Sequence, residues 1–297
     1  MTDQKGLPTR SEILQDFKGH SGCIVSLSRD GEKYSVRKTS ASIEYNVRLR
    51  SQIKKQRELG NVIRVPQVLN EGLIDGLVFF DMEYIRGFDF ASFALTHGLA
   101  SIGDSIRHLL RVVSTLATAQ SGLLEEHLFL TKLTSVTRAL KAHSLFDDFR
   151  RPIMDSLNVL GSADWCGVPK TTCHGDFTLE NMIFAPSGEP VFVDLLDGGL
   201  ESVWMDIAKL MQDLDSGWSL RSYLWSNTAD HQERLLTIIT QFVLDELSKV
   251  VRNEHPSLSL RLAQFRLLQA LRTLPYIRDR STFTRVIGSV GALNSQF

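Results

Sequence analysis

Three polar side chains near the centre of the sequence, Asp176, Asn181 and Asp194, have the types and the spacing of a phosphate-handling site. The apolar segments 182–184 and 190–193 are separated by a Pro-Ser-Gly turn, which predicts a hairpin of two short strands. Such a hairpin would return Asp194 to the side of Asn181, with Asp176 close to both. Two carboxylates and an amide oxygen suit Mg²⁺, which keeps several waters and takes further ligands from substrate phosphates.

The same three side chains match the needs of phosphoryl transfer. One carboxylate must orient the attacking hydroxyl, while an amide and a second carboxylate hold the metal against the β- and γ-phosphates. The two tasks differ, so both carboxylates are needed. The alternative is a polar loop without chemistry.

The elements that would position this site change in character near residue 90. Before it, short strands are predicted at residues 23–27, 34–38, 67–73 and 77–84. A helix is predicted over residues 42–59, where apolar and amide side chains recur at helical spacing. This part of the chain is therefore a small, sheet-rich lobe.

Long amphipathic helices are predicted for the rest of the chain. One apolar stripe runs from Ile102 to Leu116 and another from Leu128 to Leu140. Pro152 is predicted as the first residue of a third helix, and residues 231–251 and 258–271 supply two more. The layout is that of an α+β protein, in which a small antiparallel-sheet lobe precedes a larger helical lobe.

The central motif resembles the catalytic and metal-binding segments of the aminoglycoside phosphotransferase and choline kinase family, whose members are distant relatives of protein kinases. The family pattern is His-x-Asp-x-x-x-x-Asn, then a hairpin and an apolar run that ends in Asp. Here it is carried by His174, Asp176, Asn181 and Asp194. The segment around Asp206 is similar to the opening of the family's next helix, where Asp206 would brace the catalytic loop.

The resemblance implies a bilobal protein-kinase-like fold, with a nucleotide-binding N-lobe over residues 1–86 and a helical C-lobe over residues 87–297. It also implies a kinase that moves the γ-phosphate of ATP to a hydroxyl of a small molecule. Asp176 would be the catalytic base, and Asn181 and Asp194 would hold Mg²⁺.

A kinase-like hinge is expected where the apolar strand that ends near Met82 runs into Gly87. By the resemblance, the carbonyl of Glu83 accepts from the adenine amino group and the amide of Ile85 donates to the ring. Met82 would be the gatekeeper. An ordinary edge strand remains the alternative, because backbone recognition leaves little side-chain signature.

The phosphate contacts are expected from two places in the small lobe. The turn at residues 19–22, which includes Ser21, would cover the phosphates, although it lacks a full glycine-rich pattern. Lys38 and Arg37 are the candidate phosphate cations and point to opposite faces of one strand. Lys38 is favoured, because it shares its face with Val36, which would lie over adenine.

The helix that follows offers no clear carboxylate partner for the cation. Glu44 comes early in it and Glu58 late, while Gln52 and Gln56 occupy the middle. The ion pair that is usual in the family is therefore expected to be a Lys–Gln hydrogen bond.

Several acidic residues are candidates for the acceptor pocket. Asp197 would face either a cationic substrate or solvent. Asp213 and Asp215, beside Trp218, would either line the pocket or form an exposed acidic helix end.

A small acceptor is favoured over a protein. Only about a dozen residues separate Asp194 from Asp206, and the Ala-Pro-Glu segment of protein kinases is absent between them. The alternatives are a compact protein kinase and a catalytically dead nucleotide-binding scaffold of the same fold.

Composition sets the remaining bounds. The chain has 297 residues, of which 43% are hydrophobic, and a net charge of −1, which gives no basic footprint for nucleic acid. No apolar stretch approaches the roughly 18 residues that a membrane span requires. The three cysteines are too irregularly spaced for a zinc cage or a disulfide framework. The protein is expected in the cytoplasm, without nucleic-acid or membrane partners.

Overall fold

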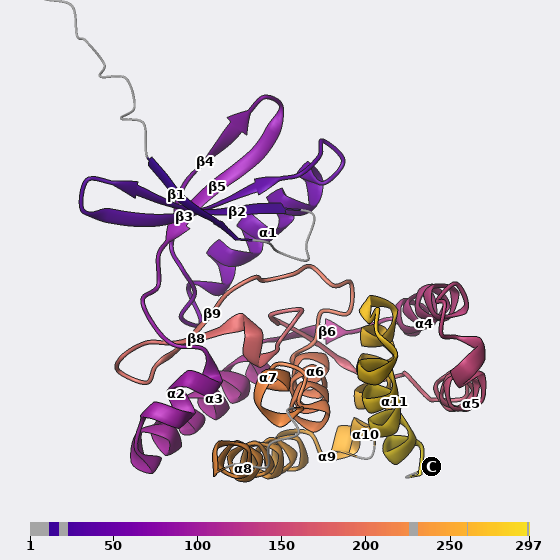
Figure 1. Ribbon diagram of the computed structural model, residues 1–297. Coiled ribbons are helices and arrows are strands. Elements are labelled where there is room, and N and C mark those ends of the chain that lie inside the picture. Colours follow the sequence, from indigo (N-terminus) through magenta and orange to yellow (C-terminus); the bar gives the residue numbers. More distant parts are fainter. Residues whose placement is uncertain (1–11, 18–22, 226–230, 260, 296) are drawn as a thin grey trace, which may run out of the picture. The chain divides into compact units, whose positions relative to one another are not determined.

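The computed structural model describes residues 12–17, 23–225, 231–259, 261–295 and 297, and its elements are labelled in Figure 1. Its contacts divide the chain into two compact units. The first unit consists of the chain up to Gly87 together with Val191–Asp197. The second consists of Phe88–Pro190 and Gly198–Phe297. A short segment from the middle of the sequence therefore belongs to the N-terminal unit.

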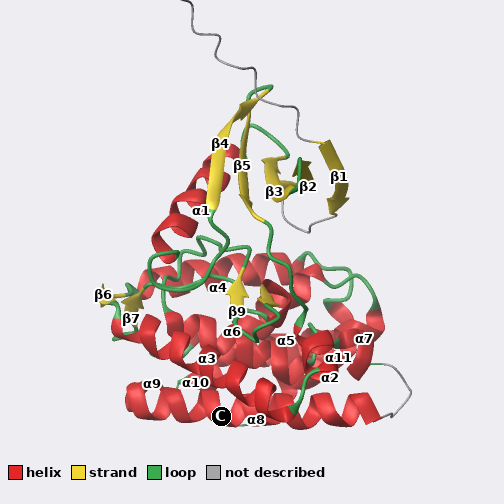
Figure 2. Ribbon diagram, turned by 90° about the vertical axis from the view of Figure 1, so that its left-hand side faces the viewer, coloured by secondary structure: helices red, strands yellow, loops and turns green. Residues whose placement is uncertain are grey.

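The first unit contains a five-stranded antiparallel sheet in the order β1-β2-β3-β5-β4 (Figure 2, strands in yellow). Its strands are β1 (Glu12–Phe17), β2 (Cys23–Asp30), β3 (Lys33–Ser40), β4 (Val68–Ile74) and β5 (Leu77–Glu83). Four of these strands were predicted from the sequence, and β1 is an addition. Asp75 and Gly76 join β4 to β5 with φ angles of 51° and 79°, the two positive values of a type I′ turn.

Helix α1 (Asn46–Leu59) packs on this sheet. It begins four residues later than the predicted start at residue 42, because the chain makes a turn before it. The apolar residues of its buried face, Leu49 and Ile53, meet Val78 and Phe80 of β5 in one core cluster. This packing explains the helical spacing of apolar residues in the sequence.

The second unit is mainly helical (Figure 1). Its helices are α2 (Phe90–Thr96), α3 (Leu99–Thr118), α4 (Glu126–Lys141), α5 (Arg150–Gly161), α6 (Val203–Ser216), α7 (Arg221–Leu224), α8 (His231–Glu254), α9 (Pro256–Ser259), α10 (Leu262–Thr273) and α11 (Arg280–Asn294). One-turn 3₁₀ helices lie at Asp147–Phe149, Leu179–Asn181 and Leu274–Tyr276. Helices α3, α4, α8 and α10 match predicted helices, whereas α11 was not predicted.

The start of α5 differs from its prediction. The helix begins at Arg150, so Pro152 is its third residue and not its first. The first turn of a helix tolerates proline, because its N–H groups have no partner within the helix. The predicted position was therefore wrong by two residues without any conflict with the chemistry of proline.

Helix α6 lies at the centre of the second unit and contacts α3, α8, α10 and α11. Twelve of its fourteen residues are buried, among them the carboxylates Asp206 and Asp213. Short strands surround the central motif: β6 (Gln120–Leu123) pairs with β7 (Pro169–Thr171), and β8 (Met182–Phe184) with β9 (Pro190–Phe192). The predicted hairpin is β8–β9. None of the described helices is both long and apolar enough to cross a membrane.

Candidate active site

The loop between β7 and β8 carries the predicted base and is bonded to α6. The buried carboxylate of Asp206 accepts the backbone N–H groups of His174 and Gly175, the latter at 2.8 Å. Gly175 has φ 92°, a value that favours glycine. The ring of His174 is fully buried, and its Nδ1 accepts the N–H of Asp176 at 3.2 Å. The buried His174 ring therefore stabilises the conformation of the loop through this hydrogen bond.

Asp176 and Asn181 lie next to each other. The amide nitrogen of Asn181 donates to the carbonyl of Asp176 at 2.8 Å and to its carboxylate Oδ2 at 3.1 Å. The nitrogen is thereby committed to Asp176, so the amide oxygen is the atom that could bind a metal. Both side chains are half-buried.

Two half-buried cations interact electrostatically with Asp176, and sequence reasoning did not find either of them. Burial lowers the pKa of Lys209 on α6 and of Arg272 on α10, and for both cations Asp176 is the strongest acidic influence in the opposite direction. Lys209 Nζ is held by Gln212 Oε1 at 3.2 Å and by Thr273 Oγ1 at 3.3 Å. The position of Lys209, one helical turn after Asp206, was the available signal.

The structure corrects the expectation for Asp213. Its side chain is neither exposed nor part of a pocket wall: it is 2% exposed and accepts the backbone N–H of Leu179 at 2.8 Å. Asp215 forms an ion pair with Arg266. The alternation of acidic and apolar residues gave no warning that Asp213 points inward, because α6 is buried on nearly every side.

In the first unit, Lys38 and Asp194 form an ion pair. Lys38 Nζ lies 2.5 Å from Asp194 Oδ1, and the side chains are 5% and 35% exposed. Asp194 has φ 57°, which is uncommon outside glycine and concentrates at functional sites. Lys38 therefore pairs with this aspartate, and the predicted hydrogen bond to Gln52 or Gln56 of α1 is wrong. Gln56 instead donates to the carbonyl of Pro66 at 2.7 Å.

Helix α1 also holds the residues that follow Asp194. Lys55 Nζ donates to the carbonyl of Leu196 at 2.7 Å, and the hydroxyl of Ser51 donates to Asp197 Oδ2 at 3.0 Å. The expected choice for Asp197 lay between a cationic substrate and solvent. The residue is exposed, which agrees with the solvent alternative, and it also accepts the hydrogen bond from Ser51 of α1.

Arg37 is committed to the opposite face of β3. Its guanidinium makes two hydrogen bonds to Asp81, at 2.7 and 2.9 Å, and lies 4.4 Å from the ring centroid of Phe79. Bidentate pairs of this kind are strong and geometrically fixed. Arg37 is thus occupied, which leaves Lys38 as the favoured phosphate cation.

The predicted hinge residues lie at and beyond the end of β5. The Glu83 carboxylate pairs with Arg64 at 2.5 and 2.9 Å, which holds its pKa below the usual range. This pair leaves the backbone role expected for Glu83 unaffected, because it uses only the side chain. Ile85 follows the strand, and Ser21 lies outside the described residues.

The predicted metal ligands fit magnesium by their chemistry. Asn181 offers an amide oxygen and Asp194 a carboxylate, and hard oxygens are what Mg²⁺ prefers. Among the described residues, no group of three or more His, Cys, Asp and Glu side chains could hold a metal ion. A site with two protein ligands depends on phosphate and water oxygens to complete it, as Mg²⁺ sites in nucleotide enzymes do.

A cavity of about 340 Å³ adjoins the loop that carries Asp176. Its lining comes from the start of α2, from Leu179 and Glu180, and from residues 219–223. Arg221 donates to Glu180 Oε1 at 2.5 Å and lies 4.9 Å from the ring of Trp218. The cavity therefore contains acidic, basic and apolar groups beside the loop.

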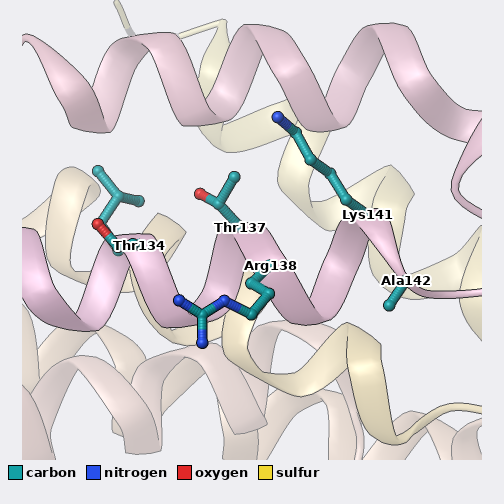
Figure 3. Close-up of a pocket in the computed structure, with 6 residues that line it drawn as sticks. Thr134, Thr137, Arg138, Lys141 and Ala142 are labelled. Carbon is teal, nitrogen blue, oxygen red and sulfur yellow. The ribbon is translucent and has the colours of Figure 1, made fainter.

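A second hollow, of about 660 Å³, lies on the surface of α4. Figure 3 shows its polar residues, Thr134, Thr137, Arg138 and Lys141, along this one helix. Its lining includes none of the predicted site residues.

Known proteins share features of this sequence and of this fold. The sequence profile of the phosphotransferase enzyme family matches residues 20–237. No curated protein matches the sequence. Among solved structures, aminoglycoside phosphotransferase APH(4)-Ia with ADP and hygromycin B has a TM-score of 0.62 at 11% identity, covering 96% of this chain and 94% of that one.

Two further structures show the same fold. A putative aminoglycoside phosphotransferase from Ralstonia eutropha has a TM-score of 0.62 at 13% identity, covering 98% of this chain and 94% of that one. ADP-bound APH(2'')-Ib has a TM-score of 0.58 at 14% identity, covering 96% and 93%. At these identities the likeness establishes the protein-kinase-like fold.

Proposed function

Because the chain belongs to the phosphotransferase enzyme family, we propose that it is a kinase that transfers the γ-phosphate of ATP to a hydroxyl of a small molecule. The observation that carries the proposal is the pairing of Asp176 with Asn181 on a loop that Asp206 holds. Three of the similar structures contain ADP or AMP-PNP, which supports ATP as the donor.

Asp176 orients the acceptor hydroxyl and takes its proton as the phosphoryl group is transferred. The positive charges of Lys209 and Arg272 interact with this carboxylate. Most of the rate comes from positioning and charge neutralisation, because the transition state is loose and needs little covalent help.

Asn181 and Asp194 are the residues that would hold Mg²⁺, through the amide oxygen and the carboxylate. The ion supplies charge neutralisation at the β- and γ-phosphates. Lys38 is the cation for the α- and β-phosphates, and its ammonium group already lies beside Asp194. The carbonyl of Glu83 and the amide of Ile85 receive the adenine edge, and we expect Ser21, which lies outside the described residues, to contact the phosphates.

The acceptor is a small hydroxylated molecule. Hygromycin B, bound in one similar structure, is of this chemical class, and the cavity beside Glu180 offers space next to the catalytic loop. We expect the protein to act in the cytoplasm, without a nucleic-acid or membrane partner.

The substitution Asp176→Asn tests this proposal together with an acceptor screen. Wild-type protein with Mg²⁺ and ATP should form ADP faster when the correct hydroxylated compound is present. Asp176→Asn should keep the affinity for ATP within a few-fold and lower turnover by roughly 10²-fold or more. Near-normal turnover in the variant would remove Asp176 from the role of base. A protein that binds Mg²⁺ and ATP but turns over with no compound would be the scaffold.

A further inference from the structure

Helix α6 presents two buried carboxylates to the catalytic loop. Asp206 and Asp213 are seven residues apart, which places them on one face of the helix and about 10 Å apart along its axis. Asp206 receives the N–H groups at the start of the loop, and Asp213 receives that of Leu179 near its end. The loop is thus fastened to a single helix at both ends.

Asp213 also binds the chain that follows α6. Gly217 ends the helix with φ 62°, and the turn brings Ser219 back to Asp213. The Ser219 hydroxyl lies 2.8 and 2.7 Å from the two carboxylate oxygens, and its N–H donates to Oδ1 at 3.0 Å. The same hydroxyl accepts the N–H of Glu180 at 3.2 Å. Asp213 and Ser219 together therefore hold two successive N–H groups of the loop.

Burying a carboxylate at this position costs free energy unless hydrogen bonds to the carboxylate compensate for it. Asp213 is buried, and it lies in the last turn of α6, where the helix dipole disfavours negative charge. A carboxylate accepts through about four lone-pair sites, and Asp213 uses them for Leu179 and Ser219. Leu179 and Ser219 both line the 340 Å³ cavity. The carboxylate of Asp213 therefore holds two segments of the cavity wall in place.

We propose that Asp213 is a positioning residue, which with Ser219 clamps the Leu179–Glu180 end of the catalytic loop and so sets the place of Asp176 relative to the adjoining cavity. The proposal rests on the proposed function in taking Asp176 as the reacting group. The clamp itself is a property of the fold and can be measured without catalysis.

Hydrogen exchange of the backbone amides measures the clamp directly. In Asp213→Asn, the amides of Leu179 and Glu180 should exchange at least tenfold faster than in wild type, while those of His174 and Gly175, held by Asp206, stay within about threefold. The matched control is Asp215→Asn on the same helix, whose partner is Arg266, and it should leave all four amides unchanged. Equal exchange at Leu179 in Asp213→Asn and wild type would overturn the proposal.

Ser219→Ala decides the matter if Asp213→Asn does not fold. Ser219 is only half-buried, and the change removes its hydroxyl while leaving the Leu179–Asp213 bond in place. Exchange at Glu180 should then rise more than exchange at Leu179. Unchanged exchange at Glu180 would overturn the proposal.

Kinetics separate positioning from simple support of the fold. At a temperature where the variants are fully folded, Asp213→Asn should lower the kcat of ATP turnover at least tenfold with the KM for ATP within twofold, and Asp215→Asn should change neither. A kcat equal to that of wild type, despite faster exchange at Leu179, would also overturn it. If wild type has no turnover, the proposed kinase function fails, and the exchange data still decide the clamp.

Discussion

Lys38 and Arg37 are neighbours on β3 whose environments differ completely. Lys38 is buried against Asp194, whereas Arg37 is tied to Asp81 on the other face of the sheet. Because strand residues alternate between faces, one residue of register decides which of the two cations lies beside Asp194. The ion pair between Arg37 and Asp81 makes Arg37 a structural residue.

The two cations are distinguished by substitution. Lys38→Ala should weaken ATP binding more than Arg37→Ala does, because only Lys38 lies beside Asp194. Arg37→Ala should instead lower the free energy of unfolding by about 1 to 3 kcal/mol, since it breaks a charge-assisted pair. Calorimetric titration with ATP and urea denaturation measure the two effects. Weaker ATP binding in Arg37→Ala than in Lys38→Ala would transfer the role to Arg37.

Asp194 is the residue on which the proposed metal site depends most. Melting temperatures measured with ATP, with and without Mg²⁺, should lose the metal-dependent shift in Asp194→Ala and keep it largely in Asp197→Ala. Asn181→Ala should fall between them, because water can replace one neutral ligand but not an anionic one. The quantity compared is the change in melting temperature on adding Mg²⁺. The melting temperature itself is expected to fall in Asp194→Ala, because Lys38 is left buried without its partner. A full shift in Asp194→Ala would exclude it as a ligand.

At the scale of elements, α6 is a support for chemistry as well as a core helix. One face of the helix carries Asp206, Lys209 and Asp213, and the two carboxylates are buried among apolar neighbours. Burial is the largest influence on the pKa of Asp213 and raises it above the usual value of 3.8, although the bonds from Leu179 and Ser219 and the charge of Lys209 act in the opposite direction. This helix therefore links the stability of the fold to pH.

The sign of that link follows from the raised pKa. A carboxyl that holds its proton more tightly when folded stabilises the fold fully below its unfolded-state pKa of 3.8, and loses that contribution as pH rises through its folded-state pKa. The unfolding free energy of wild type minus that of Asp213→Asn should therefore fall as pH rises above about 4. Urea denaturation of both proteins at several values between pH 4 and 7 measures it. If the unfolding free energy of wild type minus that of Asp213→Asn instead grows with pH, the folded state favours the ionised carboxylate of Asp213.

At the scale of the whole molecule, charge limits the choice of partners. The 33 basic and 34 acidic residues nearly cancel, to a net charge of −1. Tight non-specific binding to nucleic acid needs an excess of positive charge to release counterions from the phosphates. The kinase function proposed here requires no such excess.

This balance predicts that the protein does not shift duplex DNA or RNA in a gel at 100 mM salt, even at micromolar protein. Mg²⁺ and ATP should not change the result, because the proposed phosphate site involves only a few residues. Retardation that weakens steeply with salt would reveal a basic surface that the overall charge conceals.

The sequence alone determined the local features of this protein. The spacing of Asp176, Asn181 and Asp194 indicated one site, and the patterns of apolar and turn residues predicted four strands of the sheet, most of the long helices and the hairpin. These features depend on near neighbours, so they can be read from a single chain. The family resemblance rested on the same short segment and is confirmed.

Only the tertiary structure decided which polar groups become partners. Lys38 meets Asp194 across 156 residues, and Asp213 meets Leu179 across 34. A buried charge takes whichever partner the packing brings to it, and the sequence spacing of Asp213 was equally compatible with an exposed helix end. The inclusion of Val191–Asp197 in the first unit has the same cause. Buried polar groups need hydrogen-bond partners, and tertiary packing determines which partner lies within reach.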